Sequence, residues 1–236
     1  PLAYILCGGQ GTRLRSVIGN TQKAVAEIHG QPFIALLLRE LREAGVTEAV
    51  LCAGYRADQL LAMAEKLSAE SGIALDIAVE SEPLGTGGAL LNGLRHRAPP
   101  PRYFVLNADT FLAAEAYRQL WAASESSRET MLTVHAANRA RFGSVFFDAK
   151  GVVTRLLEKG ASGPGYVNSG AYVFSRASLA GLPLRPCSLE RDILPALAER
   201  RTLQSAAYAG NLIDIGAPES LETFKKEYSY PMRTRS

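Results

Sequence analysis

The sequence predicts an α/β fold in which a mostly parallel sheet carries helices on both faces. Three observations predict it. In the first half of the chain, short apolar runs that suit buried strands alternate with segments of helical periodicity. From about Met131 onward, short polar turns separate the apolar runs, which predicts a mixed or antiparallel extension of the sheet. With 47% hydrophobic and 21% charged residues, the chain has the composition of a globular protein with a substantial core.

The first half begins with a strand that leads into a glycine-rich loop. Apolar runs predict strands over residues 2–7, 50–53, 75–79 and 103–106. A helix opens at Gln31-Pro32 and stops at Gly45, because proline suits the start of a helix and glycine the position after its end. Helical spacing of leucines predicts two further helices, over residues 60–67 and 91–95.

The second half is predicted to begin with strands and to end with helices. We expect strands over residues 131–134, 143–147, 152–157 and 166–174, and helices over residues 189–200 and 218–228. A short strand over residues 213–216 separates the two helices. The polar and basic tail, residues 229–236, is expected to be loosely ordered.

Charge and cysteine content narrow the functional class. The net charge of +3 suits an anionic small-molecule ligand and does not indicate nucleic acid. The three cysteines are far apart in the sequence, which is typical of reduced thiols in a cytoplasmic protein. No apolar run approaches the length that crosses a membrane, so we expect a cytoplasmic protein without a membrane partner.

The loop after the first strand predicts phosphate binding. Gly8, Gly9 and Gly11 allow the backbone to approach a ligand and to turn its N–H groups inward, and Arg13 and Lys23 add positive charge. A dinucleotide fingerprint would need a small residue where Leu14 stands, and a P-loop would need a Gly-Lys pair, which the chain lacks. The alternative is a plain turn from strand to helix.

Two carboxylates follow buried strands and predict a metal site. Asp109 ends the strand over residues 103–106, and Asp214 stands between two isoleucines. Mg²⁺ prefers one or two carboxylates completed by phosphate oxygens and water, so the pair would suit an Mg²⁺–triphosphate complex. Alternatively, each aspartate caps a turn or a following helix. In an open α/β sheet the carboxyl ends of the strands share one cleft, where these residues and the glycine-rich loop could meet.

These motifs resemble those of the sugar-1-phosphate nucleotidylyltransferases. Residues 6–14 (LCGGQGTRL) look like the signature loop of that family, and Asn107-Ala108-Asp109 and Asp214-x-Gly216 look like its two metal motifs. The subgroup most similar overall is the D-glycero-α-D-manno-heptose 1-phosphate guanylyltransferases. The resemblance implies a Rossmann-like nucleotide-diphospho-sugar transferase fold and an Mg²⁺ cofactor. It also implies a single domain over residues 1–228, with a nucleotide half (1–130) and a sugar half (131–216).

The resemblance also implies roles for individual residues. Catalytic roles fall to Arg13 and Lys23, and the metal ligands would be Asp109 and Asp214. The nucleotide would be bound by Leu6, Gly8, Gly9, Gly11, Thr12, Glu80, Gly85 and Thr86. The sugar phosphate would be bound by Gly143, Glu158, Lys159 and Asn168. The chain departs from the family at two positions, with Lys23-Ala24 in place of Lys-Pro and Ala108-Asp109 in place of Gly-Asp. Without the proline, the segment that carries Lys23 is less stiff.

Glu80 favours GTP among the nucleotides. It aligns with the family position that meets the edge of the base, where an ionised carboxylate can only accept hydrogen bonds. Guanine presents N1–H and N2–H₂ side by side, whereas uracil and thymine flank one N–H with carbonyl oxygens. The alternative is a solvated residue at the end of a strand.

The expected function is transfer of GMP from GTP to a sugar 1-phosphate, giving GDP-heptose and pyrophosphate for surface polysaccharide synthesis. The partners are then GTP and the sugar phosphate, without nucleic acid, and a homodimer is one of the assemblies that the sequence allows. Within this class, mannose 1-phosphate or another nucleotide (UTP, CTP or dTTP) remains open. From other classes, a catalytically inactive regulatory subunit that binds nucleotide sugars and an α/β domain with an unrelated cofactor remain.

Overall fold

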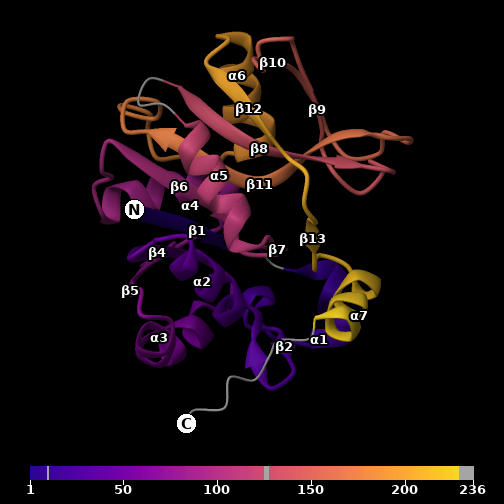
Figure 1. Ribbon diagram of the computed structural model, residues 1–236. Coiled ribbons are helices and arrows are strands. Elements are labelled where there is room, and N and C mark those ends of the chain that lie inside the picture. Colours follow the sequence, from indigo (N-terminus) through magenta and orange to yellow (C-terminus); the bar gives the residue numbers. More distant parts are fainter. Residues whose placement is uncertain (10, 125–127, 229–236) are drawn as a thin grey trace.

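The computed structural model describes residues 1–9, 11–124 and 128–228 (Figure 1). Their strands are β1 (Leu2–Cys7), β2 (Glu27–Ile28), β3 (Gln31–Pro32), β4 (Glu48–Ala53), β5 (Ala74–Val79), β6 (Arg102–Asn107), β7 (Thr110–Phe111), β8 (Glu129–Ala136), β9 (Ser144–Phe147), β10 (Val153–Leu157), β11 (Gly165–Ser175), β12 (Leu203–Tyr208) and β13 (Ile213–Asp214). Their helices are η1 (Thr12–Leu14), α1 (Arg15–Ile18), η2 (Lys23–Val25), α2 (Phe33–Glu43), α3 (Ala57–Ser71), α4 (Gly85–His96), α5 (Ala114–Ala123), η3 (Leu189–Ile193), α6 (Leu194–Glu199) and α7 (Pro218–Glu227). The predicted tail, residues 229–236, lies outside the described residues.

One sheet runs through both halves of the chain. Its order is β10-β9-β11-β6-β1-β4-β5, with β8 pairing with β11 and β12. Strands β6, β1, β4 and β5 are parallel, as predicted. Strand β11 runs antiparallel to both β6 and β8, whereas β12 runs parallel to β8. The mixed extension that the sequence predicted is therefore confirmed, and it joins the parallel part directly through β11 and β6.

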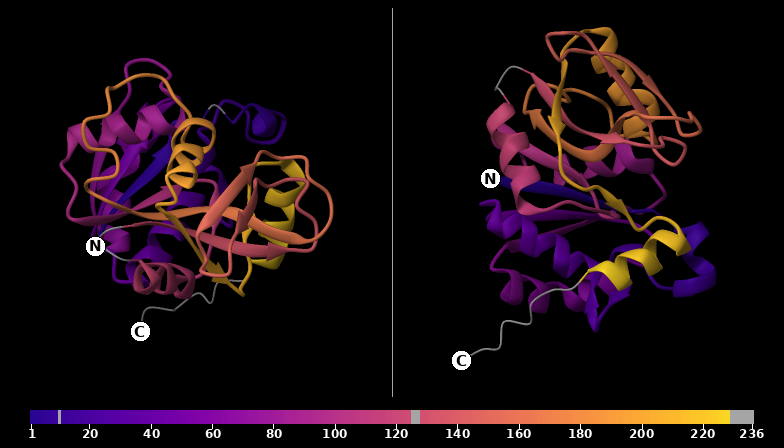
Figure 2. Two further views of the ribbon diagram at one scale, coloured as in Figure 1. Left: turned by 90° about the horizontal axis from the view of Figure 1, so that it is seen from above. Right: turned by 45° about the vertical axis from the view of Figure 1, so that its right-hand side comes forward.

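Alternate side chains of β1 face two separate helix layers, as expected for a buried strand. Ala3 and Ile5 pack in a core with α2, α3 and α5. Tyr4 and Leu6 face the opposite side, where α4, η3 and α6 close a second core. The predicted arrangement of helices on both faces is confirmed, and Figure 2 shows it from two directions.

The last helix returns to the beginning of the chain. Helix α7 lies beside α1 in each view (Figures 1 and 2), and a third core forms between them. Leu14, Ile28 and Phe33 from the first part of the chain pack there against Leu221 and Phe224 of α7, and all five are buried. The residues after Asp214 are thereby fixed against the segment that follows the glycine-rich loop.

Two of the longer elements, α5 and β12, were not predicted from the sequence, and neither were the short elements η1, α1, η2, β2, β3 and β7. Strand β12 reads LQSAAY, without a β-branched residue, and pairs with β8 at the edge of the sheet. Helix α5 is amphipathic and buries Tyr117 and Leu120 against the first core, so it carried a helical signal that the analysis did not use.

Cys7 and Cys52 are buried in the two cores and are free thiols. Burial raises the pKa of both, that of Cys52 to about 12. Within residues 1–9, 11–124 and 128–228, no helix is both long and apolar enough to cross a membrane.

Candidate active site

A cleft of about 990 Å³ opens beyond the carboxyl ends of the parallel strands. It gathers nearly all the predicted site residues, namely Leu6, Gly8, Gly9, Gly11, Lys23, Glu80, Gly85, Thr86, Asp109, Gly143, Glu158, Lys159, Asn168 and Asp214. Thr12 and Arg13 stand exposed on η1 and do not line this cleft. The roles predicted for these two residues remain predictions.

A buried glutamine fixes the position of Lys23. The Gln22 side chain is 1% exposed; its Nε2 donates to the Cys7 carbonyl at the end of β1, and its Oε1 accepts from the Ala24 N–H. The Gln22 backbone N–H donates to Gln59 Oε1 at 2.7 Å. The chain that carries Lys23 is thus held at three points, although Ala24 stands where the family more often has proline. Sequence analysis did not single out Gln22, because its partners are distant in the chain.

Lys23 lies between the two predicted metal ligands. Its ammonium forms an ion pair with Asp109, and a methyl group built on Gly216 would lie 3.0 Å from Lys23 Nζ and 2.6 Å from Asp214 Oδ1. Asp214 also accepts the Gly216 N–H at 2.6 Å, and the Asp109 carbonyl accepts the Ile215 N–H at 2.9 Å. The short pairing of β13 with β7 therefore brings the two carboxylates to one end of the cleft.

These residues fit a divalent cation that also binds phosphate. The Lys23 ammonium already stands where a positive charge is stabilised by one carboxylate and close to a second. No three His, Cys, Asp or Glu residues of the described chain converge as a metal site. Two carboxylates and the oxygens of a bound triphosphate would nevertheless match the coordination that Mg²⁺ prefers.

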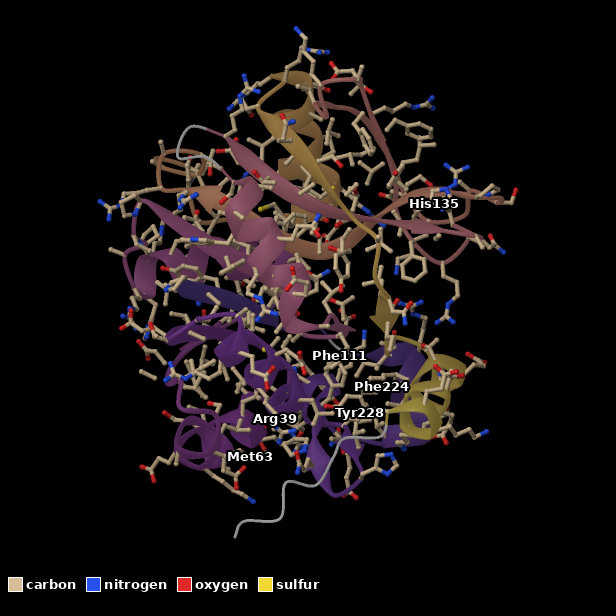
Figure 3. All side chains as sticks on the ribbon, viewed as in Figure 1. Arg39, Met63, Phe111, His135, Phe224 and Tyr228 are labelled. Carbon is tan, nitrogen blue, oxygen red and sulfur yellow. The ribbon has the colours of Figure 1, made fainter. Side chains whose placement is uncertain are left out.

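An aromatic cluster supports this end of the cleft from below. Phe111, the partner of Ile213 in the β7–β13 pair, packs against Phe224 and Tyr228 with ring centroids 5.1 and 5.3 Å apart. Phe33 reaches the same cluster, 5.6 Å from Phe224. Figure 3 labels Phe111, Phe224 and Tyr228 close together between β7 and α7. The strand ends that carry Asp109 and Asp214 are therefore backed by packed rings.

Glu80 lines the cleft directly after the end of β5. Its Oε2 accepts the Leu84 N–H at 3.1 Å, and its Oε1 lies over two glycines. A Cβ on Gly8 would lie 2.7 Å from Oε1, and one on Gly54 only 1.9 Å. Burial raises the pKa of the Glu80 carboxyl, and the hydrogen bond from Leu84 opposes this effect.

The glycine run in the first turn of α4 is a contact surface for the second half of the chain. The Cys187 carbonyl accepts the N–H groups of Gly87 and Gly88 at 3.0 and 3.2 Å, and the Cys187 N–H donates to the Leu84 carbonyl at 2.9 Å. A Cβ on Gly85, whose φ is +71°, would lie 2.6 Å from the Cys187 oxygen. N–H groups at the N-terminus of α4 that could have met a phosphate are thus already bonded.

Asn168, one of the residues predicted to bind the sugar phosphate, is held within a bulge of β11. The Asn168 N–H donates to the Gly143 carbonyl at 2.9 Å, and Asn168 Oδ1 accepts the Gly170 N–H at 2.9 Å. Its amide also bonds the Tyr172 hydroxyl. Tyr172 is buried, and burial raises its pKa well above the usual value. Asn168 and Gly143 are therefore fixed against each other on the wall of the cleft.

An ion pair that the sequence did not predict lies beside them. Arg191 Nε is 2.6 Å from Glu158 Oε1, and both side chains are largely exposed at the mouth of the cleft, next to Lys159. Arg191 and its neighbour Glu190 also line the cleft. Glu190 and Arg191 belong to a charged run at the start of a helix, which is typical of a solvated helix face. The sequence alone therefore did not indicate that they belong to the site.

Two groups of binding residues therefore line the cleft. Lys23, the glycine-rich loop and a metal held by Asp109 and Asp214 would stabilise a polyphosphate. Lys159 supplies a second positive charge near Glu158 and Asn168, whose oxygens and amide suit a hydroxylated ligand.

Comparison with known proteins agrees with this geometry. Residues 2–230 match the model of the family described as Nucleotidyl transferase. The mannose-1-phosphate guanylyltransferase catalytic subunit beta of Drosophila pseudoobscura pseudoobscura is 31% identical over 229 residues, which are 94% of this chain and 60% of the relative. The mannose-1-phosphate guanyltransferase beta-A of Xenopus laevis is 31% identical over 238 residues, 99% of this chain and 66% of the relative. The chain thus spans about three fifths to two thirds of the length of these relatives.

Solved structures share the fold over nearly the whole chain. HddC from Yersinia pseudotuberculosis superposes with a TM-score of 0.86 at 31% identity, covering 97% of this chain and 99% of its own. A second HddC structure, complexed with GMP-PN, has a TM-score of 0.84. The inositol-1-phosphate CTP transferase from T. maritima has a TM-score of 0.79 at 16% identity, with 96% of each chain covered, and shares the fold alone.

Proposed function

This chain belongs to the nucleotidyl transferase family, and from that premise we propose that it transfers GMP from GTP to a sugar 1-phosphate, releasing pyrophosphate. The observation that carries the proposal is the cleft itself. Lys23, Asp109 and Asp214 line it together with Glu80, Glu158 and Lys159. The guanylyltransferase names of the relatives, and the GMP-PN bound to HddC, support a guanine nucleotide.

In the proposed reaction a phosphate oxygen of the sugar 1-phosphate attacks the α-phosphorus of GTP. The bond from that phosphorus to the bridging oxygen breaks, and pyrophosphate leaves with the bonding electrons. The attacking oxygen is already anionic, so no protein base is needed, and catalysis depends on position and charge. Bound Mg²⁺ would neutralise and orient the phosphates.

Within this scheme the residues of the chain have distinct tasks. Lys23, held by Gln22, presents its ammonium to the α-phosphate region, and Asp109 and Asp214 would hold the metal. Arg13 is proposed to meet the pyrophosphate charge. Lys159 would bind the phosphate of the acceptor sugar, while Glu158 and Asn168 would meet its hydroxyls.

For the sugar we propose D-glycero-α-D-manno-heptose 1-phosphate, with the GDP-heptose used for surface polysaccharide synthesis. The overall sequence resemblance to the heptose subgroup supports this choice, and it is consistent with the full-length match to HddC. Mannose 1-phosphate is the second candidate, favoured by the names of the relatives from Drosophila and Xenopus.

The test is pyrophosphate release by the purified protein with Mg²⁺, each nucleoside triphosphate in turn, and a panel of sugar 1-phosphates. We expect turnover with GTP and a manno-configured heptose or hexose phosphate. Asp109→Ala should lower kcat by about 100-fold or more, because it removes a ligand of the metal ion that would neutralise the phosphates. Asp148→Ala, which breaks the remote ion pair with Arg201, is the matched control and should keep wild-type kcat. Preference for UTP or dTTP would contradict the assignment of GTP.

A further inference from the structure

Glu190 is a carboxylate in the cleft to which the family motifs of the sequence gave no role. It lies on η3, a single π-helical turn that immediately precedes α6. Such turns are rare and occur frequently at functional sites. This turn places Glu190 on the wall of the cleft, half-buried, beside Arg191.

Two hydroxyl groups fix one oxygen of this carboxylate. The Thr86 hydroxyl donates to Glu190 Oε2 at 2.6 Å, and the Ser188 hydroxyl donates to the same oxygen at 3.1 Å. Thr86 Oγ1 accepts the Leu189 N–H at 2.8 Å in turn. Because Thr86 stands in the first turn of α4, which is bonded to Cys187, both donors are held by backbone contacts. The Glu190 side chain is therefore oriented before any substrate binds.

The other oxygen, Oε1, accepts no hydrogen bond from the described part of the chain. Glu190 lines the same cleft as Asn168 and Lys159, and its neighbour Arg191 forms the ion pair with Glu158. One free carboxylate oxygen thus remains in the cleft near the predicted sugar-binding residues. A fixed carboxylate oxygen is an acceptor that suits a hydroxyl group of a sugar.

We infer that Glu190 determines sugar specificity by accepting, through Oε1, a hydrogen bond from a ring hydroxyl of the sugar 1-phosphate, with Thr86 as its positioning residue. This inference rests on the proposed function. It gives Thr86 a task different from the nucleotide contact predicted from the sequence, since the Thr86 hydroxyl is already engaged with Glu190 and Leu189.

The test takes whichever of manno-heptose 1-phosphate and mannose 1-phosphate the wild type uses better, and compares it with its 2-, 3-, 4- and 6-deoxy analogues in the wild type, Glu190→Ala and Glu190→Gln. The wild type should use one analogue about 10- to 100-fold less well in kcat/KM, the usual cost of losing a hydrogen bond to a charged group. Glu190→Ala should lower kcat/KM for the parent sugar by a similar factor and should use that analogue as well as the parent. The KM for GTP should stay unchanged.

Glu190→Gln keeps an oxygen that can accept the hydrogen bonds from Thr86 and Ser188 but removes the negative charge. It therefore distinguishes the effect of the charge from an effect on folding. It should melt like the wild type and show a smaller loss with the parent sugar than Glu190→Ala does. Glu199→Gln, an exposed glutamate at the end of α6, is the control and should behave as wild type throughout. Thr86→Val should raise the KM for the sugar phosphate; a rise confined to the KM for GTP would assign Thr86 to the nucleotide instead.

The outcomes separate the two proposals. If the wild type turns over and Glu190→Ala still discriminates against the same analogue, the assignment of Glu190 is wrong while guanylyl transfer stands. If the wild type releases no pyrophosphate with any pair, the proposed function is wrong and the assignment of Glu190 falls with it.

Discussion

At the end of β5, two glycines make room for a single carboxylate. Glu80 lies over Gly8 and Gly54, so closely that a methyl group on either would displace it. The carboxylate is thereby partly removed from water, which raises its pKa, while the Leu84 N–H holds one oxygen in place. A residue that recognises guanine by accepting hydrogen bonds from its N–H groups would need such a carboxylate in a fixed position.

Replacing Glu80 by glutamine should weaken GTP use and stabilise the fold. The folded protein binds a proton at Glu80 more tightly than the unfolded chain does, so ionising this carboxyl costs stability as pH rises above its ordinary range. Urea unfolding measured from about pH 4 to about pH 8 should give equal free energies of unfolding for Glu80→Gln and the wild type at the acid end. As pH rises, the free energy of unfolding of Glu80→Gln should exceed that of the wild type.

The KM for GTP should also depend on pH through Glu80. In the wild type alone, this KM should rise as pH falls through the raised pKa of Glu80, because the ionised carboxylate accepts the guanine N–H groups. Two results would contradict this account: a difference in the free energy of unfolding between the two proteins that does not change with pH, or a KM for GTP that depends on pH in the same way in both.

At this scale, sequence predicted the residues that carry a motif and missed those that depend on a distant partner. Glu80 and Asp109 follow recognisable strand ends. Glu190 looks like part of a solvated helix face until Thr86, 104 positions earlier in the chain, is placed beside it. Gln22 was missed for the same reason, because its role lies in its bond to Cys7.

Among the elements, the junction between α4 and the segment before η3 is the most constrained. Gly85 has a φ of +71° and no space for a Cβ beside the Cys187 carbonyl, which is backbone and cannot rotate away. The resemblance to the family predicted that Gly85 binds the nucleotide. The structure adds that this glycine also allows two segments far apart in the chain to pair.

Gly85→Ala should therefore lower the free energy of unfolding by about 2–4 kcal/mol, from the left-handed backbone and the forced shift of residue 187 together. Gly9→Ala is the matched control in the other glycine-rich loop. Its Cβ would meet nothing within 4 Å, so its unfolding free energy should change by less than about 1 kcal/mol. Denaturant unfolding of both variants measures the difference, and equal effects would refute the role assigned to the junction.

In the molecule as a whole, the site draws on both ends of the chain and on both halves of the sheet. The parallel strands and their alternation with helices could be predicted, because apolar runs and turn residues are local signals, whereas the order of these strands in the sheet was not predicted. The edge strand β12 and the union of the halves through β11 and β6 could not, because pairing between distant strands leaves no local pattern.

Mg²⁺ and GTP together should stabilise the folded protein, because Lys23, Asp109 and Asp214 are brought together only by folding. At about 100 times the Kd, a ligand adds about 2.7 kcal/mol, which for a chain of this size corresponds to a rise in Tm of roughly 5–10 °C. A thermal melt should show this rise in the wild type and in Glu158→Gln, and most of it should disappear with a chelator or with Asp214→Asn. An unchanged shift in Asp214→Asn would exclude that aspartate from the metal site.

The bonds between Cys187 and the start of α4 also bear on how such an enzyme can be re-engineered. The two predicted halves of the chain are not exchangeable modules, because backbone hydrogen bonds and close packing between residues 84–88 and 185–189 join them. A chimera that joins two parent sequences near residue 130 would take residues 84–88 from one parent and residues 185–189 from the other. A graft intended to change which sugar phosphate is used should therefore transfer residues 84–88 and 185–189 from the same parent, although about a hundred residues separate the two segments in the sequence.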